Sequence, residues 1–402
     1  MPGSTIYEEL GVPSVVNATG TKTRIGGSRI RPEAREAMDR AAEAFVRLSD
    51  LQARASDLVA DATGADAGYV TCGVASALAL GTAACIAGDD LGAMARLPDT
   101  EGLADEVVMA RTHRTGYDHA VRASGARIVD VGTNDRHLGT GSRNVEPWEY
   151  ADAITEDTAA VAYVAKPYTE PDLKTVCAIA HDEGVPVVVD AAAELPPATN
   201  LERFTDAGAD LVAFSGGKAI RGPQTTGILA GRADLVSSVA AQHLDMHAAE
   251  SVWEPPTSLL DPDELGGVPR QGIGRPMKVG KEELVGLISA LKAFVAEDHD
   301  ALGEEWLARS ERVADALDSV PGVETTITAT DKTAVAPEVA ATVDGDAAGV
   351  TATEVVAGLR REEPRVFVGA DSLPEGFTVN PMCLTDDETD YVIDRLRAHF
   401  DT

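Results

Sequence analysis

The segment from Asp210 to Gly227 joins a short apolar run, a pair of glycines and a single lysine. It reads Asp-Leu-Val-Ala-Phe-Ser-Gly-Gly-Lys-Ala-Ile-Arg-Gly-Pro-Gln-Thr-Thr-Gly, with the lysine at position 218. Glycine lets a backbone approach a flat or charged group closely, and α/β enzymes hold ligands at the ends of buried strands. Lys218 is therefore a candidate Schiff-base nucleophile for pyridoxal phosphate (PLP). The alternative is a surface lysine in a glycine turn.

The segment from Thr71 to Ala77, Thr-Cys-Gly-Val-Ala-Ser-Ala, follows one apolar run and opens a helical pattern. The exposed N–H groups of a helix N-terminus bind phosphate, and the helix dipole favours the negative charge. Gly73 would permit close approach and Ser76 would offer a hydroxyl. An ordinary strand-to-helix turn is the alternative interpretation.

Two further polar residues follow apolar runs. Asp190 ends the run Val-Val-Val-Asp, where a carboxylate can keep a pyridinium nitrogen protonated, and Ala192 leaves room beneath a flat ring. His113 follows the run at 106–110, where an imidazole can stack on a pyridine ring and move protons. A helix N-cap aspartate and a loop histidine without a role are the alternatives.

The pattern along the chain predicts an α/β fold. Seven apolar runs alternate with helical stretches, which is typical of a mostly parallel sheet with helices on both faces. The expected strands lie near 68–72, 106–110, 127–131, 160–165, 185–189, 210–214 and 226–230. The expected helices cover 31–50, 52–63, 74–87, 117–124, 171–183 and 199–207. A short connection joins the last two strands, so that pair is expected to be antiparallel or bent.

Four regions are expected along the chain. An N-terminal arm covers 1–30, a large domain 31–250, a linker rich in Pro and Gly 251–279, and a small α+β domain 280–402. One long helix is predicted over 231–249. It would place His243 and His247 one turn apart, a spacing that can share a metal ion, but no third ligand is evident and no metal site is predicted.

The composition limits the partners. The chain has 66 acidic and 34 basic residues, a net charge of −32, and only 8 lysines among its basic residues. An evenly acidic, lysine-poor surface is typical of adaptation to high salt, where self-repulsion is screened, and it argues against a nucleic-acid surface. The four cysteines form no CxxC pair, and no secretory signal or membrane span is visible, so we expect a cytoplasmic protein.

The chain resembles fold-type I PLP enzymes of the aspartate aminotransferase-like fold, in the branch of L-seryl-tRNA(Sec) selenium transferase (selenocysteine synthase) and D-glucosaminate-6-phosphate ammonia-lyase. The matching segments cover nearly the whole chain. Besides the turn at 71–77, they are Val-Val-Asn-Ala-Thr-Gly-Thr at 15–21, Gly-Gly-Ser at 26–28, Asp-Ala-Ala-Ala-Glu-Leu-Pro-Pro at 190–197, Ser-Gly-Gly-Lys-Ala-Ile-Arg-Gly-Pro-Gln at 215–224 and Gly-Ile-Gly-Arg-Pro-Met-Lys-Val-Gly-Lys at 272–281.

The resemblance implies roles for particular residues. Lys218 would form the Schiff base, Asp190 would hold the pyridinium nitrogen and His113 would stack on the ring. The candidate cofactor-binding set is Gly73, Val74, Ala75, Ser76, His113, Asp190, Ala192, Ser215 and Lys218. Candidate substrate-binding residues are Arg24 on the arm and Arg275 and Lys278 on the linker, because a substrate phosphate or carboxylate needs such charges. Solvated surface charge is the alternative for all three.

The expected activity is that of a PLP-dependent lyase acting on a small amino acid or amino sugar acid. Elimination of a β-substituent would give a 2-oxo acid and ammonia. The resemblance also implies a homodimer or larger homo-oligomer. The alternative is a selenium transferase on seryl-tRNA, although the acidic surface and the lack of an N-terminal tRNA domain make tRNA an unlikely partner. A catalytically silent protein of the same fold is a third alternative.

Overall fold

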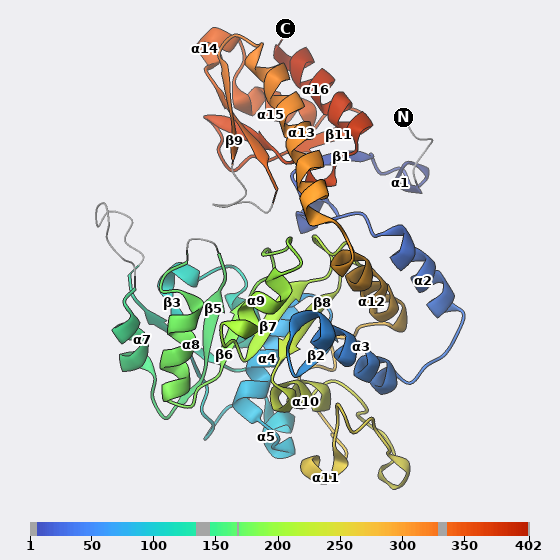
Figure 1. The fold of residues 1–402 in the computed structure, drawn as a ribbon, viewed down its shortest axis with the longest axis vertical. Coiled ribbons are helices and arrows are strands. Elements are labelled where there is room, and N and C mark those ends of the chain that lie inside the picture. The colour runs from blue at the N-terminus through green and yellow to red at the C-terminus, as the bar shows by residue number, and fades with distance from the viewer. Residues whose placement is uncertain (1–5, 134–144, 167–168, 329–335, 401–402) are drawn as a thin grey trace. The chain divides into compact units, whose positions relative to one another are not determined.

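The computed structural model describes residues 6–133, 145–166, 169–328 and 336–400. The chain divides into two compact units. The larger comprises residues 30–296, and the smaller combines residues 1–29 with 297–402. Figure 1 follows the chain through both units, which are described separately.

The larger unit is built on a seven-stranded sheet in the order β2-β8-β7-β6-β5-β3-β4. Its strands are β2 (Ala67–Thr71), β3 (Glu106–Ala110), β4 (Arg127–Val131), β5 (Thr158–Val164), β6 (Val187–Asp190), β7 (Leu211–Ser215) and β8 (Gly227–Gly231). Only β8 runs against its neighbours, since it is antiparallel to both β7 and β2. The predicted mostly parallel α/β sheet and the antiparallel last pair are both confirmed.

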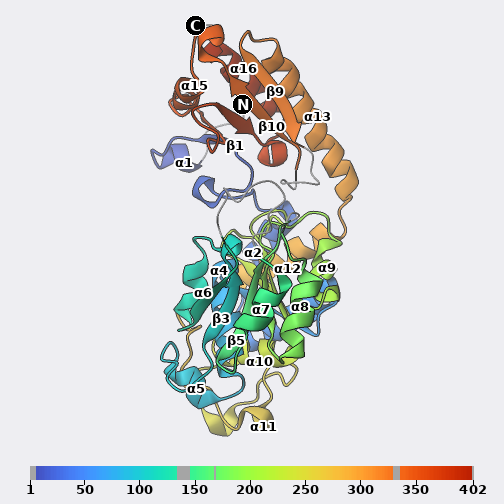
Figure 2. The same cartoon turned by 90° about the vertical axis from the view of Figure 1, so that its left-hand side faces the viewer.

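Helices cover both faces of this sheet, as Figure 2 shows around β3 and β5. One face carries α4 (Val74–Ala87), α5 (Leu91–Arg96), α6 (Asp118–Ala123) and α10 (Ala233–Ala241). The other carries α3 (Leu48–Thr63), α7 (Pro147–Ala153), α8 (Leu173–Asp182) and α9 (Asn200–Asp206). Helix α4 has the bounds predicted from the sequence. It is apolar on all sides because it is enclosed by the sheet, α6 and α10.

The prediction of one long helix over 231–249 is wrong. Helix α10 ends at Ala241, and Asp245 and His247 adopt left-handed backbone with φ of 52° and 76°. His243 and His247 therefore do not lie on a common helical turn. The His243 Nδ1 lies 2.6 Å from the Tyr69 hydroxyl instead. Among the residues described, no cluster of three or more His, Cys, Asp or Glu side chains could hold a metal ion.

The domain boundaries differ from those expected. Helix α12 (Lys281–Val295), expected at the start of the small domain, packs on α2 (Pro32–Ala42) in the larger unit. The region 251–279 contains the short elements η3 (Glu250–Val252) and α11 (Pro262–Leu265), and its Leu259 and Leu260 are buried in the core of the larger unit. It is thus part of that unit's packing and not a free linker.

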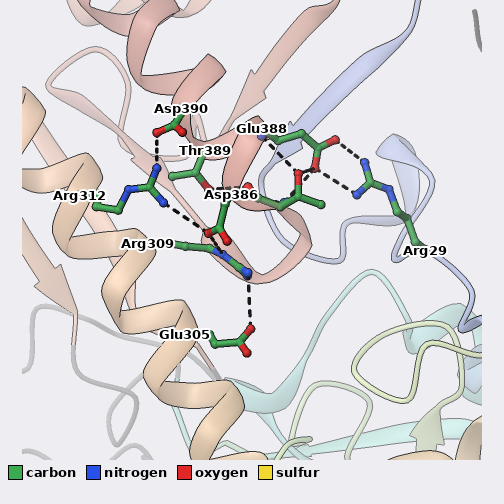
Figure 3. Close-up of polar contacts among 9 residues, drawn as sticks. Arg29, Glu305, Arg309, Arg312, Asp386, Glu388, Thr389 and Asp390 are labelled. Carbon is green, nitrogen blue, oxygen red and sulfur yellow. Dashed lines mark hydrogen bonds and ion pairs between the residues drawn. The ribbon is translucent and has the colours of Figure 1, made fainter. Parts of the chain in front are cut away.

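The smaller unit contains a three-stranded antiparallel sheet in the order β12-β10-β9. These strands are β12 (Gly376–Val379), β10 (Glu338–Val343) and β9 (Val323–Thr328). The unit's helices are α13 (His299–Asp318), α14 (Gly345–Ala348), α15 (Ala352–Leu359) and α16 (Asp386–Phe400), with the 3₁₀ turn η4 (Pro381–Cys383). Ion pairs join α13 to α16: Arg309 contacts Asp386 at 3.1 Å, and Arg312 contacts Asp386 and Asp390 (Figure 3).

The N-terminal arm is an integral part of this smaller unit. Its strand β1 (Val15–Ala18) pairs in parallel with β11 (Arg365–Val368), and the arm also contains α1 (Ile6–Glu9) and η1 (Thr23–Ile25). Arg29 forms a bidentate ion pair with Glu388 at the start of α16 (Figure 3). A sequence pattern could not place this arm, because its strand has partners about 350 residues away.

No helix in the described ranges is long and apolar enough to cross a membrane.

Candidate active site

Strand register brings the candidate residues to one edge of the seven-stranded sheet. Thr71 at the end of β2 pairs with Gly227 of β8, which also pairs with Ser215 at the end of β7. Asp190 ends β6 and pairs with Val164 of β5. Parallel strands end at one edge, and the antiparallel β8 begins there, so the phosphate turn, Ser215 and Asp190 share that edge.

The turn that carries Lys218 is crowded by its own chain. A Cβ on Gly216 would lie 2.2 Å from Thr226 Oγ1, and one on Gly217 would lie 2.4 Å from Gln224 Cα. The Gly216 N–H also donates to the Thr226 carbonyl at 2.9 Å. The expectation that these glycines make room for a ligand therefore needs correction. They allow residues 224–226 to pack against the turn, and this packing fixes the position of the Lys218 backbone.

Lys218 and Asp190 influence each other's charge. Burial lowers the pKa of Lys218, while the Asp190 carboxylate acts in the opposite direction. Burial raises the pKa of Asp190, opposed by the Ala192 N–H, which donates to Asp190 Oδ1 at 3.0 Å, and by the Lys218 ammonium. Burial penalises both charged forms and their mutual attraction favours them, so the charge state of each group depends on the other.

The turn before α4 is arranged to receive an anion. Gly73 has a φ of 89°, a conformation that favours glycine, and no side chain caps the helix in the described structure. The first turn of the helix contains the N–H groups of Val74, Ala75 and Ser76. In an α-helix, the N–H groups of the first turn have no acceptor within the helix. The Ser76 hydroxyl lies 3.2 Å from the Cys72 carbonyl and is partly exposed. A phosphate is the ligand that such a turn binds best.

His113 follows β3 at the same edge and is buried. Its ring meets Tyr163 edge-on, with centroids 4.9 Å apart, and its Nδ1 accepts from the Val164 N–H at 3.4 Å. Burial lowers the pKa of His113 to about 4, so the ring is neutral at pH 7. With Nδ1 as acceptor, the proton is on Nε2, which is buried without a hydrogen-bond partner among the described residues.

Two charged residues near this edge were missed in the sequence. Lys166 follows β5 and Glu194 lies four residues after Asp190, and their side chains form an ion pair at 2.9 Å. The signal was present, because Lys166 directly follows a predicted strand. Only the fold shows that it neighbours Asp190.

The three candidate substrate residues belong to different units. Arg275 and Lys278 are exposed in the larger unit, and Arg275 lowers the pKa of the nearby His243, adding to the effect of burial. Arg24 is exposed on the arm of the smaller unit, near Asp371. The role of these three residues in binding the substrate stays a prediction.

The described residues fit PLP. The turn at Gly73 can receive the phosphate, Asp190 can meet the ring nitrogen, and Lys218 supplies the amine for a Schiff base. The unpartnered Nε2–H of His113 supports this fit, because a buried donor without an acceptor is costly and is expected where a ligand completes the site.

Comparison with known proteins decides the family. Over 401 residues the chain is 31% identical to D-glucosaminate-6-phosphate ammonia lyase from Salmonella typhimurium, a match that covers 98% of this chain and 97% of that protein. The chain belongs to that family of PLP-dependent enzymes. The solved structure of D-glucosaminate-6-phosphate ammonia-lyase superposes with a TM-score of 0.79 at 29% identity, covering 99% of this chain and 98% of that one.

Other relatives of this PLP-dependent enzyme carry different activities. A 5'-C-glycyluridine monooxygenase-decarboxylase from Streptomyces is 32% identical, covering 97% of this chain and 90% of that protein. An L-seryl-tRNA(Sec) selenium transferase from Actinobacillus pleuropneumoniae is 28% identical but covers only 40% of this chain and 38% of that protein. The aminotransferase class-V family model matches residues 116–252. The predicted fold type and PLP dependence are thereby confirmed.

Proposed function

We propose that this enzyme is an ammonia-lyase that acts on a small amino acid or amino sugar acid carrying a leaving group at the β-carbon. The proposal is supported by near full-length similarity to D-glucosaminate-6-phosphate ammonia lyase together with a partly buried Lys218 and Asp190 whose charges act on each other at the sheet edge. The substrate would lose a β-hydroxyl as water, and hydrolysis of the resulting enamine would give a 2-oxo acid and ammonia.

Bound PLP supplies an electron sink for the negative charge that develops at the substrate α-carbon. Lys218 then acts as the base. Burial lowers the pKa of its amine, which raises the fraction that is neutral and able to accept the α-proton. Asp190 provides the negative charge for the ring nitrogen, and the N–H groups of the turn at Gly73 hold the phosphate. The neutral His113 can donate a hydrogen bond from Nε2 without adding charge.

A monooxygenase-decarboxylase is the second candidate, because the Streptomyces relative is as similar as the ammonia lyase. The two activities differ in the reactants that they consume and in the products that they release. A lyase releases ammonia and a 2-oxo acid without oxygen, whereas a monooxygenase-decarboxylase requires O₂ and releases CO₂. The selenium transferase alternative has weaker support, since its relative matches over less than half of either chain and this chain's net charge is −32.

The decisive experiment incubates the purified enzyme and PLP with D-glucosaminate-6-phosphate, and then with other β-hydroxy amino acids, in parallel under anaerobic conditions and in the presence of O₂. Ammonia and 2-oxo acid should form in equal amounts. Product formation that requires O₂ and is accompanied by CO₂ would instead establish the second candidate. Tight binding of seryl-tRNA in place of turnover would support the transferase.

The site assignment has its own test. Borohydride reduction should fix the cofactor on the peptide that contains Lys218, and Lys218→Ala should lose the visible absorbance. Asp190→Ala should keep the covalent bond but lower kcat by roughly 10²-fold, as expected for removal of a charge that stabilises the transition state. A label on any other lysine would show that the assignment is wrong.

Three further properties belong to this proposal. A homodimer or larger homo-oligomer is expected from the family resemblance, and sedimentation would measure it. A cytoplasmic location is supported by four cysteines without disulfides in the described structure. Adaptation to high salt is supported by 66 acidic residues against 34 basic ones.

A further inference from the structure

Lys166 and Glu194 lie next to the Lys218–Asp190 pair because of strand order. Lys166 follows β5, and Glu194 follows β6, the strand beside it. The Ala165 N–H donates to the Asp190 carbonyl at 2.9 Å, which fixes the start of the Lys166 loop against the end of β6. The Lys166 Nζ then reaches Glu194 Oε1 at 2.9 Å.

Hydrogen bonds fix the backbone of Glu194, and the residue is 5% exposed. Its N–H donates to the Ala191 carbonyl at 3.2 Å, and its carbonyl accepts from Asn200 Nδ2 at 2.7 Å. Burial of a carboxylate is costly unless a cation compensates it. Lys166 is the cation that supplies this compensation, and its side chain remains about one-third exposed.

Four charges therefore occur together at the sheet edge, two positive and two negative. Besides burial, which raises the pKa of Asp190, the Lys166 ammonium lowers it and so favours the ionised carboxylate. Burial lowers the pKa of Lys218, Lys166 lowers it further, and Glu194 raises it. The two members of the ion pair thus act on the Lys218 amine in opposite directions.

Other ionisable groups border the pair from neighbouring helices. Asp172 at the N-cap of α8, Lys174 on α8 and Arg203 on α9 line a cavity of about 240 Å³ together with Lys166 and Glu194. All three are exposed, so water screens their charges. Burial raises the pKa of Tyr163, which lines the same cavity, well above its ordinary value, and the nearby His113 is neutral at pH 7, so neither adds charge.

We propose that Lys166 and Glu194 are positioning residues that together set the protonation of Lys218 and keep Asp190 ionised. Lys166 favours the neutral amine that a base needs, and Glu194 limits this effect and holds Lys166 in place. The inference rests on the proposed role of Lys218 in binding the cofactor and accepting the α-proton.

The test compares pH titrations of the visible absorbance of full-length enzyme loaded with PLP. Lys166→Met should raise the titration midpoint, because a cation is lost and Glu194 is left unopposed. Glu194→Gln should lower it, because the Lys166 charge is no longer balanced. The double variant should return towards the wild-type midpoint, since net charge is restored. Lys174→Met is the matched control and should leave the midpoint unchanged, because it removes an exposed lysine from the same cavity.

If the two residues had a purely structural role, the titration midpoints of the two single variants would not shift in opposite directions. Unchanged midpoints, or shifts in the same direction for the two single variants, would overturn the proposal. If a variant binds no PLP, Lys218 in the cofactor-free chain is labelled with an amine-reactive reagent over a range of pH. The labelling midpoint must then rise in Lys166→Met and fall in Glu194→Gln, and equal midpoints would also overturn the proposal. Wild-type enzyme without visible absorbance would instead contradict the cofactor assignment itself.

Discussion

The crowded turn before Lys218 makes Gly217→Ala a sharp test of how the structure positions its lysine. The added Cβ would lie 2.4 Å from Gln224 Cα and 2.9 Å from the Gln224 carbonyl oxygen. Ordinary contacts begin at about 3.4 Å, so one side of the turn must move by about 1 Å. Both contacts are with backbone atoms, which cannot rotate away.

The expected cost follows from this displacement. Overpacking of a well-packed region costs about 1–3 kcal/mol in free energy of unfolding. A misplacement of about 1 Å in a reacting group can lower kcat by roughly 10²-fold. We expect both effects in Gly217→Ala, with kcat reduced more than KM is raised, because the lysine is displaced while the phosphate turn at Gly73 is unchanged.

The assay combines urea unfolding with steady-state kinetics on the loaded enzyme. Gly303→Ala provides a matched control, since it adds the same methyl group within α13, where no described atom beyond the adjoining backbone and chain neighbours lies within 4 Å. There the change should raise stability by up to about 1 kcal/mol, as expected for glycine to alanine in a helix. The reasoning would be refuted by a Gly217→Ala enzyme with wild-type stability and kcat within about twofold.

Two further predictions concern pH and salt. The pKa of His113 falls from 6.5 to about 4 on burial, so the unfolded chain binds a proton that the folded one does not, and stability should fall as pH decreases from 6.5 to 4. One such histidine accounts for about 3 kcal/mol, and the difference between wild-type and His113→Gln unfolding free energies across that range would measure it. With a net charge of −32, the chain should also gain thermal stability between about 0.1 and 3 M KCl as repulsion is screened. A midpoint that falls over that range would contradict adaptation to high salt.

Much of the large sheet could be predicted because its signals are local. Strands buried on both faces need continuous apolar runs, and the seven runs correspond to the seven strands. Helix α4 was equally clear, since Gly73 precedes an uninterrupted helical pattern. The end of α10 was not, because the residues after Ala241 are still compatible with a helix. They leave it to make contacts such as the one between His243 and Tyr69, which lie 174 residues apart.

Residue order alone identified the side chains that could do the chemistry: a lysine after two glycines, an aspartate after three valines, and a glycine at the head of a helix. These identities follow from residue types beside short strands. Which of these residues are neighbours in space became evident only from the folded chain. It showed that Gly216 and Gly217 accommodate the chain's own loop, and that Lys166 and Glu194 border the Lys218–Asp190 pair. The physical reason is that strand neighbours are set by long-range hydrogen bonding and packing, whereas a sequence pattern reports only the conformation of nearby residues.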